Sequence, residues 1–317
     1  MAPTLLPQLE GRIFISEAGF ETDLIFYDGI DLPHFATFPM LETSEGRDTM
    51  RAYFQSVIDI ARRDTTGVVI ETPTWRASAE WGALLGYSSD RLDHVNRDAV
   101  ALFIEFRDAS PDVPVVISGN IGPRGEGYTI TETMTQREAA DYHRPQIRSL
   151  AAAGADLVSA LTINHSAEAA GIVEAARDEN VPAVISFTVE TNGNLPSGQT
   201  LAAAIEEVDA ATDQGAAYFM VNCAHPSHFV HVLDVPGPWE RLRGIRANAS
   251  TMSHQELDNA TELDRGNEAE LVAGYVEFAE RLPRLAVVGG CCGTDLRHLD
   301  LISSAVARYR TTATTDR

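Results

Sequence analysis

Short apolar runs alternate with amphipathic helical stretches along almost the whole chain. Eight of these runs are predicted strands: Arg12–Ser16, Gly67–Glu71, Val113–Ser118, Asp156–Leu161, Ala183–Thr188, Tyr218–Asn222, Leu242–Ala247 and Leu285–Val288. Helical periodicity marks most of the segments between them: Thr49–Arg63, Leu92–Arg107, Thr135–Ala153, Ala167–Asp178, Leu201–Gln214, Glu268–Arg281 and Asp295–Tyr309, with a shorter candidate at Pro226–Leu233. Strands that alternate with helices pair in parallel, and eight of them favour a closed (β/α)8 TIM barrel, an α/β fold. An open doubly wound sheet is the alternative, but no Gly-x-Gly-x-x-Gly opens a helix after the first strand.

The chain has the size and composition of one soluble domain. Its 317 residues, of which 44% are hydrophobic, can bury a single large core, and barrels of this length form one domain. We therefore expect a single barrel domain over residues 1–310 and a threonine-rich tail at 311–317 that frays. No apolar run reaches the length of a membrane span, and no basic region precedes an apolar one at the N-terminus. A cytoplasmic location without membrane contact is the expectation.

Charge excludes several classes of function. The formal net charge of −22 at pH 7 argues against a nucleic-acid partner, because phosphate binding requires a basic surface. The chain contains no lysine, so all 24 basic residues are arginines. Schiff-base chemistry, attachment of pyridoxal phosphate and a P-loop lysine are therefore excluded. Small-molecule partners remain, and the sequence indicates no oligomeric state.

The chain has only three cysteines, and all three follow predicted strands. Cys223 ends one apolar run, and the adjacent Cys291 and Cys292 follow another across Gly289 and Gly290. In a barrel, both strand ends lie at the C-terminal face, where active sites are built. Three thiolates suit Zn²⁺ and leave its fourth tetrahedral position open, as catalytic zinc requires.

The residue types alone leave other interpretations open. Buried cysteines often act as small apolar residues with no further role. A disulfide between Cys291 and Cys292 would close a strained ring of adjacent residues, and the acidic composition gives no sign of an oxidising compartment. A closed structural zinc site is a third alternative, with His225, His228 or His298 as the fourth ligand.

The segments around these cysteines resemble the homocysteine S-methyltransferase family, which includes betaine– and S-methylmethionine–homocysteine methyltransferases. Val-Asn-Cys223, followed later by Gly-Gly-Cys-Cys-Gly-Thr294, is similar to the zinc-binding signature of that family. The opening Ile15–Leu24 is similar to the family's Asp-Gly…Thr-Glu-Leu, and Ser118–Pro123 resembles its Gly-Ser-x-Gly-Pro loop. The resemblance covers essentially the whole chain.

The resemblance implies an enzyme of methionine biosynthesis that moves a methyl group from an onium donor to the thiol of homocysteine or a close analogue. Cys223, Cys291 and Cys292 would be ligands of Zn²⁺ and not nucleophiles. A free thiol is mostly protonated at neutral pH, whereas a thiol bound to Zn²⁺ loses its proton. Alignment with the donor then supplies most of the acceleration, so no catalytic residue is needed beyond the zinc centre.

Six residues at the predicted strand ends are expected to bind substrates: Glu17, Thr22, Trp75, Asn120, Asn222 and Asn248. Trp75 follows the second strand, where relatives place aromatic residues around the donor, and an indole ring attracts a sulfonium or quaternary ammonium. Asn248 and Ser250 are candidates for binding a substrate carboxylate, and a plain loop with a helix cap at Ser253 is an equal alternative.

Three positions depart from the family pattern. The opening aspartate is Glu17 here, and the glycine that follows it is Ala18. Leu161 replaces the acidic residue that relatives place after the fourth strand to hold the amino group of homocysteine. An unpaired ammonium is costly to bury. Either Glu17, Glu71 or Asp23 therefore takes over this group, with Glu17 suggested by the opening motif, or the acceptor is a different thiol.

Two functions of other classes are compatible with the same cysteines. A zinc-dependent lyase or hydrolase on this barrel would need a carboxylate or histidine beside the metal as a base. A non-catalytic barrel would keep a closed structural zinc site. Zinc content together with thiol-dependent methyl release distinguishes the three functions.

Overall fold

Eight parallel strands form a closed barrel in the computed structural model, which describes residues 6–130, 133–260 and 262–315. The strands follow one another around the ring in chain order, and β8 pairs with β1. They are β1 (Phe14–Ile15), β2 (Gly67–Glu71), β3 (Val115–Ile121), β4 (Leu157–Ile163), β5 (Ala183–Phe187), β6 (Ala216–Asn222), β7 (Leu242–Ala247) and β8 (Val287–Gly290). The closed ring confirms the predicted (β/α)8 barrel and excludes the open doubly wound sheet.

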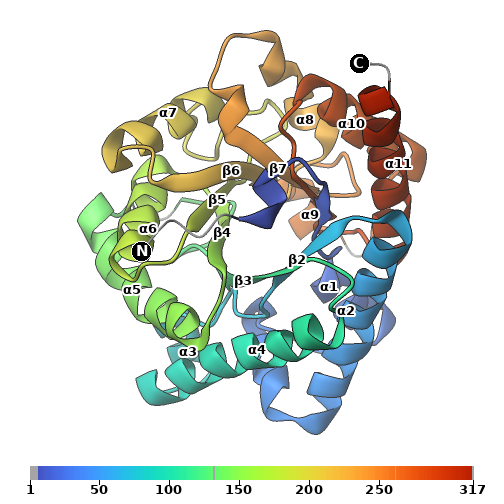
Figure 1. The fold of residues 1–317 in the computed structure, drawn as a ribbon. Helices are drawn as coiled ribbons and strands as arrows, with labels where there is room; N and C mark the ends of the chain where they lie inside the picture. Colours follow the sequence, from blue (N-terminus) through green and yellow to red (C-terminus); the bar gives the residue numbers. More distant parts are fainter. Residues whose placement is uncertain (1–5, 131–132, 261, 316–317) are drawn as a thin grey trace.

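Helices surround this ring, as Figure 1 shows. The long ones are α2 (Ser44–Asp64), α4 (Ser89–Ala109), α5 (Gln136–Ala153), α6 (Ser166–Asp178), α7 (Leu201–Thr212), α10 (Glu268–Arg281) and α11 (Leu296–Thr315), and each overlaps a predicted helical stretch. The short helix α8 (Pro226–Phe229) lies within the shorter candidate. Two further short helices, α1 (Phe20–Thr22) and α3 (Ala79–Leu84), were not predicted, because they are too brief to show a period. The short helix α9 (His254–Asp258) begins after Ser253, which caps it as the sequence suggested.

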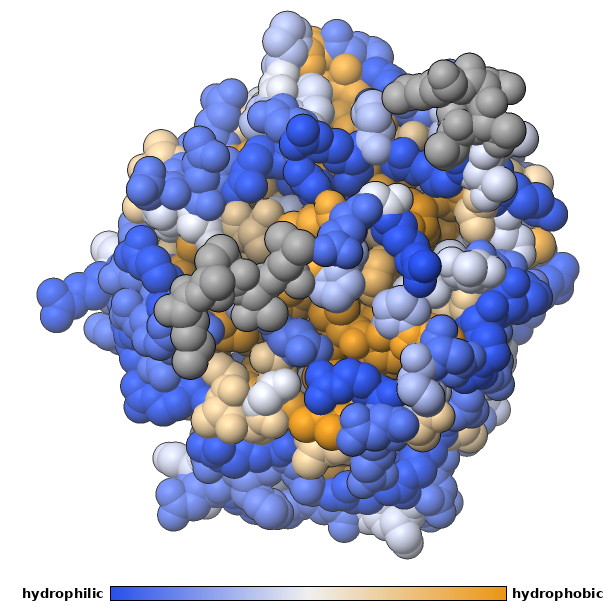
Figure 2. All heavy atoms as spheres, viewed as in Figure 1, coloured by the Kyte–Doolittle hydropathy of each residue, from blue (hydrophilic) through white to orange (hydrophobic). Residues whose placement is uncertain are grey.

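Local sequence signals set the helix ends. Helix α5 begins with a capping box in which Thr135 accepts a hydrogen bond from the backbone of Glu138 and Glu138 accepts one from the backbone of Thr135. It ends at Gly154, whose φ of 98° is readily adopted only by glycine. None of the described helices combines the length and the apolar character needed to cross a membrane. Figure 2 shows hydrophilic residues over most of one face of the molecule, with hydrophobic residues visible between them.

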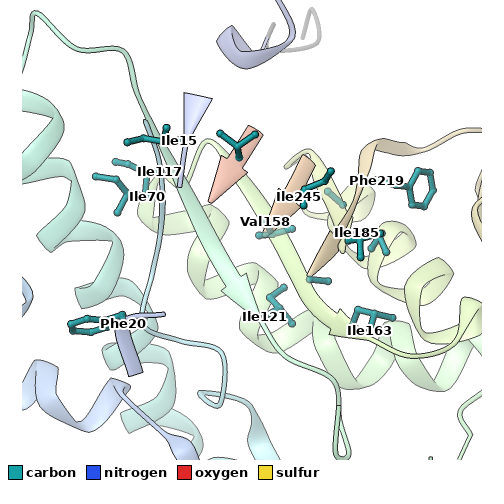
Figure 3. Packing of buried hydrophobic residues seen from close by; sticks show 14 of the residues in the cluster. Ile15, Phe20, Ile70, Ile117, Ile121, Val158, Ile163, Ile185, Phe219 and Ile245 are labelled. Carbon is teal, nitrogen blue, oxygen red and sulfur yellow. The ribbon is translucent and has the colours of Figure 1, made fainter. Parts of the chain in front are cut away.

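The strands are buried on both faces, which explains why they appear in the sequence as continuous apolar runs. Outward-facing residues such as Ile70, Ile117 and Ile185 belong to the large cluster between the barrel and its helices (Figure 3). Alternate residues form a second, smaller cluster inside the barrel: Leu6, Phe14, Val69, Val116, Leu157, Val184, Tyr218, Met220, Ala286 and Val287. Every strand except β7 therefore contributes an apolar side chain to the barrel interior.

The barrel interior becomes polar toward the ends of the strands. Two positions beyond the apolar layer, the same alternation brings inward Glu71 of β2, Ser118 of β3, Ser159 of β4, Ser186 of β5, Asn222 of β6 and Arg246 of β7, all of them buried. The hydroxyl of Ser118 donates a hydrogen bond to that of Ser159 at 2.8 Å. A buried polar layer of this kind, at the face where barrel strands end, is the usual place for a site.

The start of the described chain closes the opposite end of the barrel. A 3₁₀ helix, η1 (Pro7–Leu9), follows Leu6, which packs into the interior apolar cluster. Gln8 is fully buried and donates a hydrogen bond to the hydroxyl of Tyr218 at 3.2 Å. In Figure 1 this dark blue segment lies near the middle of the ring.

Several element boundaries differ from the prediction because strand pairing continues into glycine-containing sequence. Strand β8 starts and ends two residues later than predicted and includes Gly289 and Gly290, and β3 extends through Asn120 to Ile121. Conversely, β1 is reduced to two paired residues. Helix α11 continues to Thr315, so the tail expected from Thr311 starts within a helix. The domain boundary at residue 310 and the fraying beyond it stay predictions.

Candidate active site

Three cysteine side chains meet at the C-terminal face of the barrel. Cys223 directly follows β6, Cys291 and Cys292 directly follow β8, and the three Sγ atoms lie within 4.8 Å of one another. Cys223 and Cys291 are joined as a disulfide in this structure, with their Cα atoms 5.5 Å apart, and Cys292 is free. The adjacent Cys291 and Cys292 are not the bonded pair. A metal ion bound by all three sulfur atoms would require the reduced state, because the thiolate is the ligand.

Backbone hydrogen bonds connect the cysteine pair after β8 to the end of β7 and to the loop that follows it. Cys291 donates its N–H to Ala247 at 2.9 Å, and Ala249 donates its N–H to Cys292 at 3.1 Å. A side chain at position 290 would collide with Thr294, which itself hydrogen-bonds to the carbonyl of Cys291 at 2.6 Å. Glycine before the cysteine pair therefore allows β8 to approach the loop that follows β1.

Asn222 connects Cys223 to the neighbouring strands. Its Oδ1 accepts hydrogen bonds from the N–H of Thr162 at 2.8 Å and from the hydroxyl of Ser186 at 2.7 Å. Its Nδ2 donates to Thr162 Oγ1 at 2.8 Å and to Cys223 Sγ at 3.2 Å. These bonds occupy both acceptor and both donor positions of the amide. The geometry thus assigns Asn222 to positioning the site, and direct contact with substrate stays a prediction.

Thr162 lies in an irregular part of β4. The pairing register with β5 shifts between Ala160 and Ile163, and Thr162 has a φ of 63°. This left-handed conformation is strained for a β-branched residue. The two hydrogen bonds between Thr162 and Asn222, one donated by each residue, hold Thr162 in place at the wall of the site.

A cavity surrounds the three cysteines, and we call it the thiol cavity. It is lined by polar or charged residues that include Glu17, Glu71, Asn120 and Arg246, together with Leu161 and Trp75. Arg246 Nη1 lies 2.8 Å from Glu17 Oε1, and both side chains are almost fully buried. Arg246 also donates its Nε–H to the carbonyl of Gly290 at 3.1 Å. Arg246 at the end of β7 is therefore linked to the segment after β1 by the ion pair and to the end of β8 by the hydrogen bond.

Burial and mutual repulsion shift the ionisation of the two glutamates. Burial raises the pKa of Glu17, although Arg246 opposes the shift. Burial and then the charge of Glu17 raise the pKa of Glu71 to about 7. Burial also raises the pKa of the Cys292 thiol to about 11, and the negative charge of Glu21 adds to the shift. Buried negative charge is thus unfavourable throughout this cavity unless a cation is present.

A second, larger cavity adjoins the thiol cavity, and we call it the outer cavity. The two cavities share Thr22, Phe35, Trp75, Tyr128 and Cys292 among their walls. Further wall residues include Arg76, Asn248, Ser250 and His254. The ring of Tyr128 stacks on that of His254 with centroids 4.1 Å apart. The outer cavity therefore has an aromatic wall beside one cysteine.

One face of Trp75 is already occupied by a cation. The guanidinium of Arg76 lies 4.1 Å from the ring centroid of Trp75 and 3.6 Å from that of Trp81. Arg76 is 5% exposed and pairs with Glu126 at 3.2 Å. Trp81 lines neither cavity. Only Trp75 of these two indoles can therefore contact a bound molecule directly.

All nine residues predicted for the site line one of the two cavities. Asn248 lies in the outer cavity, where its Nδ2 donates to the carbonyl of Cys223 at 3.1 Å, and the other eight line the thiol cavity. Asp23 lines neither. Arg246 was not predicted, although its alternation with the apolar Ile245 on β7 would have placed it inside the barrel.

A (β/α)8 barrel with three cysteines and buried carboxylates at its C-terminal face defines an enzyme scaffold suited to sulfur chemistry. A family model described as homocysteine S-methyltransferase matches residues 33–306. Homocysteine S-methyltransferase 2 of Zea mays is 24% identical and aligns with 71% of this chain and 72% of its own length.

Solved structures share the fold. The oxidized form of the homocysteine methyltransferase MmuM from Escherichia coli superposes with a TM-score of 0.72 at 17% identity, covering 92% of this chain and 95% of that chain. Its metallated form gives a TM-score of 0.70 at 16% identity, covering 93% and 96%. The chain therefore belongs to the homocysteine S-methyltransferase family, and it is a thiol S-methyltransferase.

Proposed function

We propose that this protein transfers a methyl group from an onium donor to the thiol of homocysteine or a close analogue, with Zn²⁺ bound by Cys223, Cys291 and Cys292. The convergence of three sulfur atoms within 4.8 Å of one another, inside a cavity that also contains buried carboxylates, is the observation that carries the proposal. Family membership favours methyl transfer over a zinc-dependent lyase or hydrolase on the same barrel.

The three cysteines suit an open zinc site. Thiolates are preferred ligands of Zn²⁺. Among the described residues, the side chains close enough together to bind one metal ion at this place are these three cysteines, and no histidine is among them. His228 hydrogen-bonds to the carbonyl of Thr251 at 2.8 Å, and His298 contacts Asp295 at 2.7 Å. The third candidate, His225, is not within reach of the cysteine group either, so the described residues give no fourth ligand for a closed Cys₃His site. Bound Zn²⁺ would supply a positive charge that favours the thiolate form of the acceptor.

The two cavities suggest where each substrate binds. The thiol cavity contains all three cysteines, so the acceptor occupies it with its sulfur beside them. The outer cavity reaches Cys292 and shares Trp75, Phe35 and Tyr128 with the thiol cavity, so the donor would approach from that side. Aromatic faces attract a sulfonium or quaternary ammonium. The chain's own contribution is to bring the two reacting groups into line and exclude water.

A donor-by-thiol activity matrix tests the proposal. Reduced, zinc-loaded protein would be incubated with betaine, S-methylmethionine, dimethylsulfoniopropionate or S-adenosylmethionine, each with homocysteine or another thiol, and the methylated product measured by mass spectrometry. We expect thiol-dependent product with at least one donor. No product from any combination would reject the proposal.

The zinc ligands have their own test. We expect elemental analysis of the reduced protein to give one Zn²⁺ per chain, and Cys291→Ala or Cys292→Ala to lose both zinc and activity while circular dichroism still reports a folded barrel. At Cys223 the φ of 57° makes Cys223→Gly the less strained replacement. Full zinc occupancy in any of these variants would contradict the assignment.

A further inference from the structure

We propose that Glu71, at the end of β2, binds the ammonium group of the acceptor and makes this protein selective for thiols that are amino acids. The inference rests on the proposed function and specifies its acceptor. It follows from the unpaired acceptor atoms in the thiol cavity and from the distribution of charge around them.

Three buried oxygen atoms on the wall of the thiol cavity lack a hydrogen-bond partner among the described residues. They are Oε2 of Glu71, Oε2 of Glu17 and Oδ1 of Asn120. Glu71 is 3% exposed, Glu17 5% and Asn120 9%. Buried polar atoms are nearly always paired in native proteins, so atoms of this kind indicate a missing partner. All three are acceptors. Arg246 Nη1 on the same wall also lacks a hydrogen bond, but it lies in the ion pair with Glu17 Oε1 at 2.8 Å, so the missing partner of the three oxygen atoms is a hydrogen-bond donor.

The charges around these atoms leave one carboxylate in excess. Arg246 forms its ion pair with Glu17, with Nη1 and Oε1 2.8 Å apart. Glu71 forms no ion pair of this kind with any residue in the described part of the chain. Glu17, Glu71 and Arg246 together therefore carry a net charge of about −1 when Glu71 is ionised, and Glu21 on the same wall brings no positive charge to offset it. A cation that enters the thiol cavity would restore neutrality.

An ammonium group meets both requirements at once. It carries one positive charge and three N–H donors, and it has no acceptor that would conflict with the three oxygen atoms. The hydroxyls of Ser118 and Ser159 on β3 and β4 lie near the Glu71 carboxyl and favour its ionised form. Leu161, on the same cavity wall, offers no charge. Of the two wall carboxylates with an unpaired buried oxygen, Glu17 and Glu71, only Glu71 is thus not already held in an ion pair.

The occupant of this position is the acceptor, because Glu71 lines the thiol cavity and not the outer cavity. The acceptor's sulfur is placed beside the cysteines that line the same cavity. An α-amino-acid thiol carries its ammonium group a few bonds from its sulfur, so one molecule can contact both. A thiol without the ammonium group would leave Glu71 unpaired.

Calorimetric binding of two matched thiols to the reduced, zinc-loaded protein tests this proposal without any methyl donor. Homocysteine and 4-mercaptobutyrate differ by the ammonium group alone. We expect the wild-type protein to bind homocysteine more tightly, and Glu71→Gln to reduce that preference by roughly ten- to hundredfold, since one charged hydrogen bond and its ion pair are lost. Binding of 4-mercaptobutyrate should not weaken. Glu17→Gln should reduce the preference less, because Glu17 is already paired with Arg246.

Glu280→Gln is the matched control, because Glu280 is an exposed glutamate of α10 that lines neither cavity. Equal affinity of the wild-type protein for the two thiols would overturn the proposal and leave methyl transfer to another thiol intact. The same holds if Glu71→Gln keeps the preference while Glu17→Gln abolishes it. If neither thiol binds the wild-type protein, the proposed function itself fails, and this inference with it. Thermal unfolding of each variant checks that the barrel is retained.

Discussion

Glu71 shows how one buried residue couples ionisation to stability. In the unfolded chain its carboxyl has the ordinary pKa of 4.5, whereas burial and the charge of Glu17 raise the pKa to about 7 in the folded protein. Arg246 from β7 and the hydroxyls of Ser118 and Ser159 oppose that rise. Between these pKa values the folded protein holds a proton that the unfolded chain has released. The stability that this proton adds to the folded protein is fully present below pH 4.5 and is lost as the pH rises through 7.

Glu71→Gln should therefore flatten the pH dependence of stability in the ligand-free protein. We expect the wild-type free energy of unfolding to fall between about pH 5 and pH 8, and the variant to show a smaller fall. Glu17 and Glu21 also have raised pKa values, so some fall remains in the variant. Denaturant unfolding at several pH values measures both curves. Parallel curves would show that Glu71 does not titrate in this range.

The role of Trp75 in binding the methyl donor can be tested by a single substitution. We expect Trp75→Leu to raise the KM for the methyl donor by about two- to thirtyfold, which corresponds to the loss of roughly 0.5–2 kcal/mol of cation–π attraction. The affinity for the thiol should stay nearly the same. Trp81→Leu is a close control, because Trp81 also stacks on Arg76 yet lines neither cavity. Steady-state kinetics in which both substrates weaken equally would assign Trp75 to packing instead.

At the scale of elements, the amide of Asn222 joins β4, β5 and β6 through Thr162, Ser186 and its own strand. The remaining bond of this amide is to Cys223, which directly follows β6. The strand ends that carry the site are thus connected directly, in addition to their backbone pairing. A change in this amide is expected to affect β4 and Cys223 together.

Asn222→Ala should lower the free energy of unfolding by about 1–3 kcal/mol or more, because it leaves the buried N–H of Thr162 without its partner. Zinc affinity should fall as well, since Cys223 Sγ loses a hydrogen-bond donor. Ser186→Ala removes only one of the four bonds and should have a smaller effect on both quantities. Equal effects of the two substitutions, measured by denaturant unfolding and zinc titration, would contradict the central role of Asn222.

The sequence predicted the strands, the helices and the place of the site better than the local contacts within the site. The alternation of apolar runs and helical stretches was sufficient for the closed barrel, and three cysteines at two strand ends were sufficient for a shared site. The left-handed conformation of Thr162 was not predictable, because it depends on a bonding partner on β6. The pairing of Glu17 with Arg246 was missed for a similar reason, since it joins distant segments whose approach depends on barrel closure.

At the scale of the whole molecule, the two ends of the barrel differ. Cavities lie at the C-terminal ends of the strands, whereas Leu6 and Gln8 fill the opposite end. Leu6 is 4% exposed and contributes to the interior apolar cluster. The apolar layer thus lies between this segment and the polar layer that carries the site.

Leu6→Ala should therefore lower the free energy of unfolding by about 2–5 kcal/mol, as expected for a buried leucine, while the zinc content stays unchanged. Leu84→Ala is the matched control, because Leu84 is 62% exposed and should change stability by less than about 0.5 kcal/mol. Denaturant unfolding and elemental analysis measure the two effects. Loss of zinc in Leu6→Ala would show that the two ends of the barrel are coupled.

The strained backbone at Thr162 bears on how such a chain can evolve. A glycine at this position would adopt the φ of 63° without steric cost, but it would remove the hydroxyl that Asn222 contacts. Selection for thermal robustness alone would favour the glycine, whereas selection for an ordered thiol cavity would retain the threonine. Position 162 is thus a place where a stabilised descendant of this enzyme would be expected to lose catalytic proficiency.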